Sequence, residues 1–267
     1  MSAILAIDPA WTSTEPSGVA LLKKSRARWR CVALAPDYAS FLALHTHAVD
    51  WHAPRFFGSV PDPSALLAAA GQHLNGGDVS LVTVDMPVSA QAIVARRASD
   101  NAVSSAFGSA WCGCHTPSRT RPGPIGAAMS QGFAAAGFDV GTTATVCGTP
   151  RKLLEVYPHP ALLKLLKLER RHTYKVSKHR AYWPDDAVPT RVRKLLAALQ
   201  QILDALRTRI DGIPLELPAY SSALRFAQLK RYEDAIDALI CGWIGIEYFN
   251  GSASAYGDDT SAIWIPK

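Results

Sequence analysis

The sequence predicts an α/β fold built around a mixed β-sheet flanked by helices. Three short apolar segments, at residues 3–7, 18–22 and 29–34, follow one another at the spacing of β-hairpins. A continuous run rich in β-branched residues, VSLVTVD at 79–85, is typical of a strand covered on both faces. Helical segments separate the first three strands from this run, so we expect early antiparallel strands and a later parallel one in the same sheet.

The remaining elements follow from local patterns. Residues 39–47 and 64–74 are expected to be helical, the second opened by Pro63 and closed by the Asn-Gly-Gly at 75–77. Residues 108–124 have the Gly, Pro, Ser and Thr content of a long loop. The prediction is completed by six further elements: a helix at 126–136, a strand at 153–156, a helix ending at 168, an amphipathic helix at 188–210, a buried helix at 232–248 and an edge strand at 261–266.

The whole chain, 1–267, is therefore expected to form one domain, in which a loop and a helix at about 96–150 are inserted after the fourth strand and a basic helical segment spans about 158–210. Hydrophobic residues make up 48% and charged residues 19%, which is a globular composition. No apolar run approaches the roughly 18 residues that a membrane helix needs, and no basic leader suggests secretion. The five cysteines are irregularly spaced, which indicates free thiols and a cytoplasmic location.

The net charge of +6 is unevenly distributed along the chain. Between residues 151 and 209, fourteen basic residues stand against five acidic ones. Such a stretch is expected of a surface that meets phosphates. A solvated helical face in a basic protein explains the same composition, so both interpretations stay open.

Five acidic residues interrupt otherwise apolar sequence. Asp8 ends ILAID, Asp85 ends LVTVD, and Glu155 lies inside LLEVYP. Asp234 and Asp237 are three residues apart in YEDAIDALICGW and fall on about the same face of the last helix. Converging carboxylates repel one another, and a divalent cation held between them removes the repulsion. Oxygen ligands of this kind suit Mg²⁺ or Mn²⁺ rather than Zn²⁺.

Each acid also has a structural explanation. Asp8 and Asp85 fit turn residues that bond nearby backbone amides at strand ends. Glu155 can pair with Arg151 or Lys152, and Asp234 can pair with Lys230 one helical turn earlier. The functional interpretation depends on all of these acids meeting in one place.

Five motifs, in a fixed order between residues 4 and 243, carry a resemblance to a known family: IDPAW, PSGVALL, VDMPVS, EVYPHPALL and EDAIDALICGW. In these motifs the chain resembles the domain-of-unknown-function family 429, predicted nucleases with an RNase H-like fold, and EVYPHPA is the most specific of them. The resemblance implies an RNase H-like mixed five-stranded sheet in which the first and fourth strands are neighbours. Asp8 and Asp85 would then meet at one edge of a cleft, and the last helix would deliver Asp237.

We therefore expect a metal-dependent nuclease that hydrolyses phosphodiester bonds, with Mg²⁺ or Mn²⁺ as cofactor and DNA or RNA as partner. The expected catalytic residues are Asp8, Asp85, Glu155 and Asp237, and the expected metal ligands are Asp8, Asp85, Asp237 and Asp234. Two alternatives stay open: a non-catalytic nucleic-acid-binding module of the same fold, and an ATPase of the actin and sugar-kinase type. The second is disfavoured because no G-K-[ST] phosphate loop occurs.

Basic residues near these motifs are candidates for contacts with substrate. Arg96, Arg97, Lys175 and Arg180 are expected to contact phosphates, although a solvated surface position explains each of them as well. His159, between two prolines in YPHP, either exchanges a proton at the site or caps the following helix.

A cluster of soft ligands lies in the predicted loop. Cys112, Cys114 and His115 offer two thiols and an imidazole, which zinc binds readily. The cluster lacks a matching second half, so we predict no zinc site. Trp11, close to Asp8, either stacks on a base or packs against the sheet edge.

Overall fold

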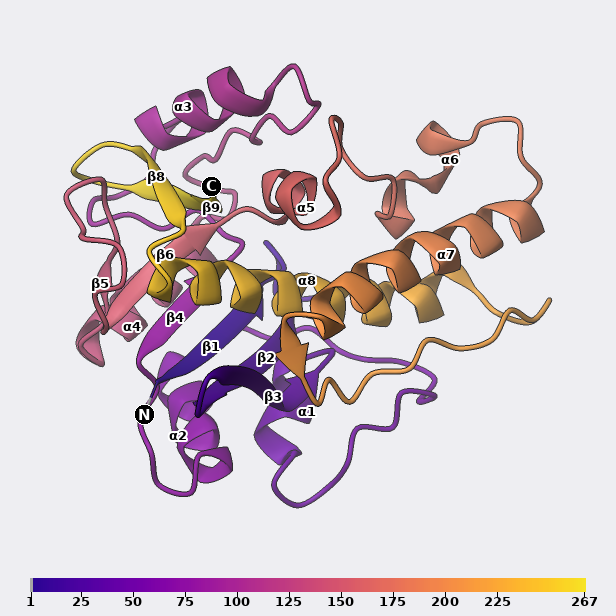
Figure 1. Ribbon diagram of the computed structural model, residues 1–267, viewed down its shortest axis with the longest axis horizontal. Helices are drawn as coiled ribbons and strands as arrows, with labels where there is room; N and C mark the ends of the chain where they lie inside the picture. The colour runs from indigo at the N-terminus through magenta and orange to yellow at the C-terminus, as the bar shows by residue number, and fades with distance from the viewer. Residues whose placement is uncertain (1) are drawn as a thin grey trace.

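The computed structural model describes residues 2–267 and arranges their strands in one mixed sheet (Figure 1). The order across the sheet is β7-β3-β2-β1-β4-β6-β9-β8, with β5 beside β6. The sheet of nine strands is thus larger than the five expected. The strands are β1 Ala3–Asp8, β2 Gly18–Ser25, β3 Arg28–Ala35, β4 Leu81–Val84, β5 Asp139–Val140, β6 Lys152–Val156, β7 Ile210–Asp211, β8 Ala253–Gly257 and β9 Ala262–Pro266.

Strand directions follow the mixed pattern that the sequence predicts. β1, β2 and β3 are antiparallel neighbours, whereas β1, β4, β6 and β9 run parallel to one another. The first and fourth strands lie side by side, as expected, with Ile7 opposite Val84. Because β1, β4 and β6 are parallel, their carboxyl ends meet at one edge of the sheet.

Helices cover both faces of the sheet (Figure 1). They are α1 Tyr38–Ala43, α2 Pro63–His73, α3 Ala98–Phe107, α4 Pro124–Ala135, α5 Pro158–Leu166, α6 His179–Tyr182, α7 Val188–Arg207 and α8 Phe226–Phe249, with a 3-10 turn η1 at Val176–Lys178. Side chains of β1 alternate between the two cores: Ile4 and Ala6 pack with α5, α7 and α8, and Leu5 and Ile7 pack with α1, α2 and α4. The fold is therefore a sheet between two helical layers.

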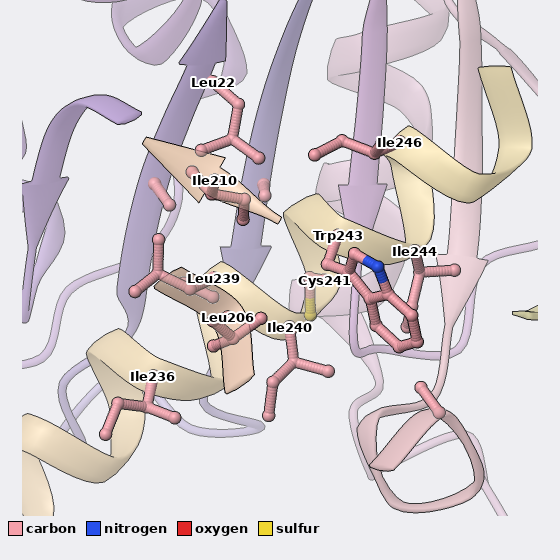
Figure 2. Packing of buried hydrophobic residues seen from close by; sticks show 14 of the residues in the cluster. Leu22, Leu206, Ile210, Ile236, Leu239, Ile240, Cys241, Trp243, Ile244 and Ile246 are labelled. Carbon is pink, nitrogen blue, oxygen red and sulfur yellow. The ribbon is translucent and has the colours of Figure 1, made fainter. Parts of the chain in front are cut away.

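Helix α8 lies directly on the sheet, and its apolar side chains pack with those of α7 and of strands β2 and β7 (Figure 2). Small residues permit the close approach. A Cβ at Gly242 would stand 2.6 Å from Leu22, and one at Gly245 would stand 3.1 Å from Ile4 and Thr83. Because these positions carry no side chain, α8 reaches β1, β2 and β4 closely enough for its acidic residues to join the sheet edge.

Several predicted boundaries differ from the structure. Residues 261–266 form a strand, β9, but it lies between β6 and β8 rather than at the edge. The edge strand is β8, which covers β9 through antiparallel pairing and keeps all five residues of β9 buried. Helix α8 begins at Phe226, earlier than predicted, because the Arg225 backbone N–H donates to the Gln228 side chain and caps the helix there.

Residues 96–150 contain α3, α4 and β5, and residues 158–210 contain α5, η1, α6 and α7. The division into one domain with an inserted segment and a basic segment stays a prediction. Helix α3 stands where no separate element was predicted, before the expected loop. No helix within residues 2–267 combines the length and the apolar character that crossing a membrane requires.

Candidate functional site

Two carboxylates meet at the carboxyl edge of the parallel strands. Asp8 is the last residue of β1, and Asp85 follows β4 directly. The backbone N–H of Asp85 donates to the carbonyl of Ile7 at 3.1 Å, so the pairing of the two strands continues up to the acids. We call Asp8 and Asp85 the strand-end pair. Their meeting is the one that the sequence predicts.

Helix α8 adds further acids to the same edge. Asp8 lies opposite Gly18 in the register of β1 and β2. A Cβ at Gly18 would stand only 2.0 Å from the carbonyl oxygen of Asp234, so the glycine lets the α8 backbone touch the sheet here. This contact places Glu233, Asp234 and Asp237 near the strand-end pair. We call these three residues the helix acids.

Within residues 2–267, the carboxylates of the strand-end pair lack donors. Neither carboxylate forms a hydrogen bond or an ion pair with any residue in the part of the chain that the structure describes. Burial raises the pKa of Asp8 well above its usual value; Asp237 and Asp85 add to this rise, and Lys175 opposes it. Burial likewise raises the pKa of Asp85 to about 7. Two carboxylates are thus held together without the donors that would stabilise their charges.

The helix acids, in contrast, are all partnered. Asp237 accepts from the Tyr174 hydroxyl at 2.6 Å on one oxygen and from Lys175 Nζ at 2.5 Å on the other. Glu233 accepts from the Val176 backbone N–H at 2.5 Å and from Lys230 Nζ at 3.0 Å. Asp234 accepts from Lys230 as well.

Lys175 lies within this acid cluster. Its Nζ is 2.5 Å from Asp237 and 3.6 Å from Glu233. Burial alone would lower the pKa of Lys175, but Asp237, Glu233 and Asp8 raise it well above the usual value. Lys175 is therefore an ammonium that balances part of the negative charge. Its expected role as a phosphate contact stays a prediction, because the described contacts direct it toward the acids.

Glu155 and Arg97 neutralise each other. Arg97 donates to the two oxygens of Glu155 at 2.6 and 2.7 Å, and the Val88 N–H donates to the same carboxylate at 3.0 Å. Arg97 also bonds Asp100 at 2.7 Å. The charge of Glu155 contributes to the raised pKa of Asp85, but its oxygens already have donors. The structure therefore gives both residues a structural contact, and neither predicted functional role is tested.

Arg96 and Arg180 occupy different surroundings. Arg96 donates to Asn101 at 2.6 Å, to Ser104 at 2.6 Å and to Thr116 at 2.9 Å, which ties α3 to the following loop. Arg180 is exposed on α6. For both residues, contact with a phosphate remains a prediction.

His159 is buried at the start of α5, directly after β6. Its Nε2 lies 2.5 Å from Nη2 of Arg171. Burial, Lys175 and Arg171 hold the pKa of His159 well below its usual range, so the ring is neutral. Since an arginine only donates, Nε2 is the acceptor and Nδ1 carries the proton. His159 thus positions an arginine that sequence reasoning did not single out.

Cys112, Cys114 and His115 do not gather a metal site. Cys112 is buried and its Sγ donates to the Ala110 carbonyl, while His115 is exposed. Within residues 2–267, no three side chains of His, Cys, Asp or Glu are arranged to hold an ion by themselves. Trp11 is partly buried, packs against the core formed with α1, α2 and α4, and carries the guanidinium of Arg121 over its ring at 5.6 Å.

Sequence reasoning missed Glu233, Tyr174 and Arg171. Glu233 had a signal, because it adjoins Asp234 in a helix that is apolar on most faces, where any acid needs a partner. Tyr174 and Arg171 had no comparable signal. They stand in a polar stretch between two helices, and only the folded chain brings them to residues far away in the sequence.

The family described as "Protein of unknown function (DUF429)" matches residues 24–261. The chain belongs to this family. Asp85, Glu155, Asp234 and Asp237 lie inside the matched range, whereas Asp8 precedes it. No curated protein matches the chain significantly, and neither does any solved structure.

Proposed function

We propose that this member of the DUF429 family is a divalent-metal-dependent nuclease, which hydrolyses phosphodiester bonds at the strand-end pair. The observation that carries the proposal is the contrast in partners. Asp8 and Asp85 are close and half-buried, and no residue among 2–267 donates to them, whereas every helix acid has a donor. Carboxylates without donors are available to a ligand.

The strand order supports the RNase H-like part of the proposal. The five central strands run β3-β2-β1-β4-β6, of which the first three are antiparallel and the last three parallel. The motif resemblance leads us to expect a mixed sheet with the first and fourth strands as neighbours, and this order supports that expectation. The other strands extend the two sides of these five.

The strand-end pair fits Mg²⁺ or Mn²⁺ by its chemistry. Asp8 and Asp85 offer hard oxygen donors, and Mg²⁺ is usually held by one or two carboxylates together with substrate phosphates. An ion here would therefore share its coordination between the pair and the substrate. Asp234 and Asp237 can join the ligands only by giving up Lys230 and Lys175, so their predicted role as ligands requires a rearrangement.

A bound ion would supply an activated water and a Lewis acid for the leaving oxygen. The chain itself holds Asp8 and Asp85 at the ends of two paired strands, which restricts their separation. Lys175, fixed by Asp237, reduces the negative charge that an approaching phosphate meets. Hydrolysis adds water across one P–O bond and yields a phosphomonoester and a free hydroxyl group.

The test is cleavage of labelled DNA and RNA oligonucleotides, single- and double-stranded, in Mn²⁺ or in EDTA. The parent protein should cleave at least one of them in Mn²⁺ only. Asp8→Asn and Asp85→Asn should each lower the rate more than about 100-fold, since even residues that only support a metal ligand are worth about 10- to 100-fold. Asp139→Asn is the matched control, because Asp139 is exposed on β5. Equal rates for the parent and the two variants would refute the assignment.

A non-catalytic nucleic-acid-binding module is the second candidate. The observation that favours it is Lys175, whose ammonium already neutralises Asp237. In such a module this internal cation would replace the metal. Oligonucleotide binding that persists in EDTA, together with no cleavage of any substrate in Mn²⁺, would favour the module over the nuclease.

A further inference from the structure

Arg171 lies beside the start of α5 without an acidic partner. Its backbone N–H donates to the Ala110 carbonyl at 2.9 Å, and its Nη2 meets His159. No ion pair formed within residues 2–267 includes Arg171. Its Nε is buried and has no hydrogen-bond partner among those residues. Leaving a buried N–H of a charged group without a hydrogen bond costs free energy. The guanidinium is therefore suited to bind an acceptor on a ligand.

Arg171 also stands at the edge that carries the strand-end pair. His159 opens α5 three residues after the end of β6. Strand β6 runs parallel to β4 with Glu155 opposite Val84, so α5 starts at the edge where Asp85 follows β4. The bond to His159 therefore holds Arg171 close to one carboxylate of the pair.

Further basic groups gather around Arg171. The charges of Arg171, Arg121 and Lys178 all act on His115, whose pKa is lowered by burial and by these three groups. None of the four enters an ion pair within the part of the chain that the structure describes. We call Arg171, Arg121, Lys178 and His115 the Arg171 cluster. Arg171 acts on one acid of the site, Asp85, whose burial-raised pKa it lowers without forming an ion pair among residues 2–267.

We propose that the Arg171 cluster binds a phosphate group of the substrate next to the bond that is cleaved at the strand-end pair. The position relative to cleavage rests on the proposed function, whereas the binding itself does not. A guanidinium offers two parallel N–H donors that match two phosphate oxygens, and lysine adds a point charge. The nearby carboxylates of the pair would repel a bound anion unless such a group held it.

An exposed tryptophan indicates which phosphate compound fits best. Trp111 is 62% exposed, and the guanidinium of Arg170 lies 4.8 Å from its ring centre. The preceding residue, Ala110, accepts the backbone hydrogen bond of Arg171, so the ring adjoins the cluster. Exposed aromatic rings stack on unpaired bases of any sequence. A phosphate site beside such a ring suits a single-stranded nucleic acid.

The experiment measures binding without cleavage. Fluorescence anisotropy of a 5′-labelled single-stranded oligonucleotide is recorded in EDTA for the full chain, for Arg171→Gln and for Arg209→Gln. Arg209 is the matched control: it is exposed, and it adjoins Ile210, which pairs with Trp29 near the sheet edge opposite the acids. Arg171→Gln should weaken binding at least about tenfold and lower the slope of log affinity against log salt by about 0.7, the value of one single-strand phosphate contact. Arg209→Gln should stay within about twofold of the parent.

A second variant guards against misfolding of Arg171→Gln. Lys178 is exposed at the end of η1, so Lys178→Gln should keep the fold and still weaken binding about threefold, with a smaller salt slope. Parent-like affinity in both the Arg171 and the Lys178 variant would overturn the inference.

Inorganic phosphate separates a nucleic acid from a small phosphate compound as ligand. A first outcome is that phosphate raises the melting temperature of the parent but not that of Arg171→Gln, while no oligonucleotide binds. This result would support the phosphate site and assign it to a small phosphate compound. Binding of neither probe to the parent would overturn the inference. A separate cleavage assay in Mn²⁺ distinguishes the two proposals. Binding that depends on Arg171, without any cleavage, refutes only the nuclease. Cleavage by the parent, together with unchanged oligonucleotide binding by Arg171→Gln, refutes only the phosphate site.

Discussion

The strand-end pair and the helix acids show how one type of side chain acquires two different roles at the same sheet edge. Asp8 and Asp85 come from strands, whose backbones pair with each other and leave both carboxylates without donors. The helix acids come from α8, and each receives a hydrogen bond from a lysine, a tyrosine or a backbone amide. The difference teaches that proximity of acids does not define the site. Hydrogen-bond donors of the protein neutralise the helix acids. The strand-end pair receives no such donor among residues 2–267 and is available to a ligand.

The sharpest way to break this comparison is to remove one charge from each group. Asp237→Asn leaves the ammonium of Lys175 buried beside a neutral amide, and breaking a buried ion pair in this way costs about 3–5 kcal/mol. Asp8→Asn removes a carboxyl group whose charged form the fold disfavours, so the free energy of unfolding should stay the same or rise. Urea denaturation of both variants in EDTA measures this. Similar losses of stability in both would show that the two groups are not different.

Replacing the internal cation tests the same division from the other side. Lys175→Met should destabilise the protein in EDTA, because Asp237 and Glu233 lose their ammonium. Mn²⁺ should then recover stability in this variant, since a cation that binds only the folded state contributes about 2.7 kcal/mol at a hundredfold excess over its dissociation constant. Thermal unfolding with and without Mn²⁺ measures the recovery. A variant with the same response to Mn²⁺ as the parent would mean that the ion does not reach the helix acids.

A smaller effect is expected from the contact that holds the two groups together. A methyl group at Gly18 would overlap the Asp234 carbonyl, so Gly18→Ala should shift α8 and cost about 1–3 kcal/mol. Gly71 is the control. It lies inside α2, where a Cβ would meet nothing nearer than 3.8 Å, so Gly71→Ala should stabilise by about 0.4–1 kcal/mol. Urea denaturation compares them, and an unchanged Gly18→Ala variant would show that α8 can move without loss.

Local patterns predict that Asp8 and Asp85 each end a strand, and the family resemblance implies that these two strands are neighbours. Asp8 and Asp85 each end an apolar run, and parallel pairing of two such strands brings their ends together. The last helix could be predicted to be buried, and Asp234 and Asp237 to share a face. The extra strand β8 could not, since ASAYG has neither the alternation nor the β-branched content of a strand.

The donors to Asp237 and Glu155 could not be predicted, because they lie far away along the chain. The hydroxyl that bonds Asp237 belongs to Tyr174, 63 positions earlier, and the arginine that bonds Glu155 is Arg97, 58 positions earlier. No periodicity or motif connects such pairs. Sequence reasoning therefore found the acids but, among their donors, only Lys230 for Asp234, and the donors decide which acids remain available.

A further effect is expected in the pH dependence of stability. Burial raises the pKa of Asp85 from 3.8 to about 7 in the folded protein. Between these values the folded state retains a proton that the unfolded state has lost, so this carboxyl makes stability fall as the pH rises from about 4 to about 7. Asp85→Asn removes that contribution. In EDTA the variant should therefore gain in melting temperature over the parent as the pH rises from 5 to 8, with little difference at pH 4.

Because Asp8 and Asp85 act on each other, the transition belongs to the pair, and Asp8→Asn should reduce it too. In Mn²⁺ the parent should lose this pH dependence, since the bound ion favours both charged carboxylates. A pH-independent difference between parent and Asp85→Asn would mean that Asp85 titrates like an exposed acid.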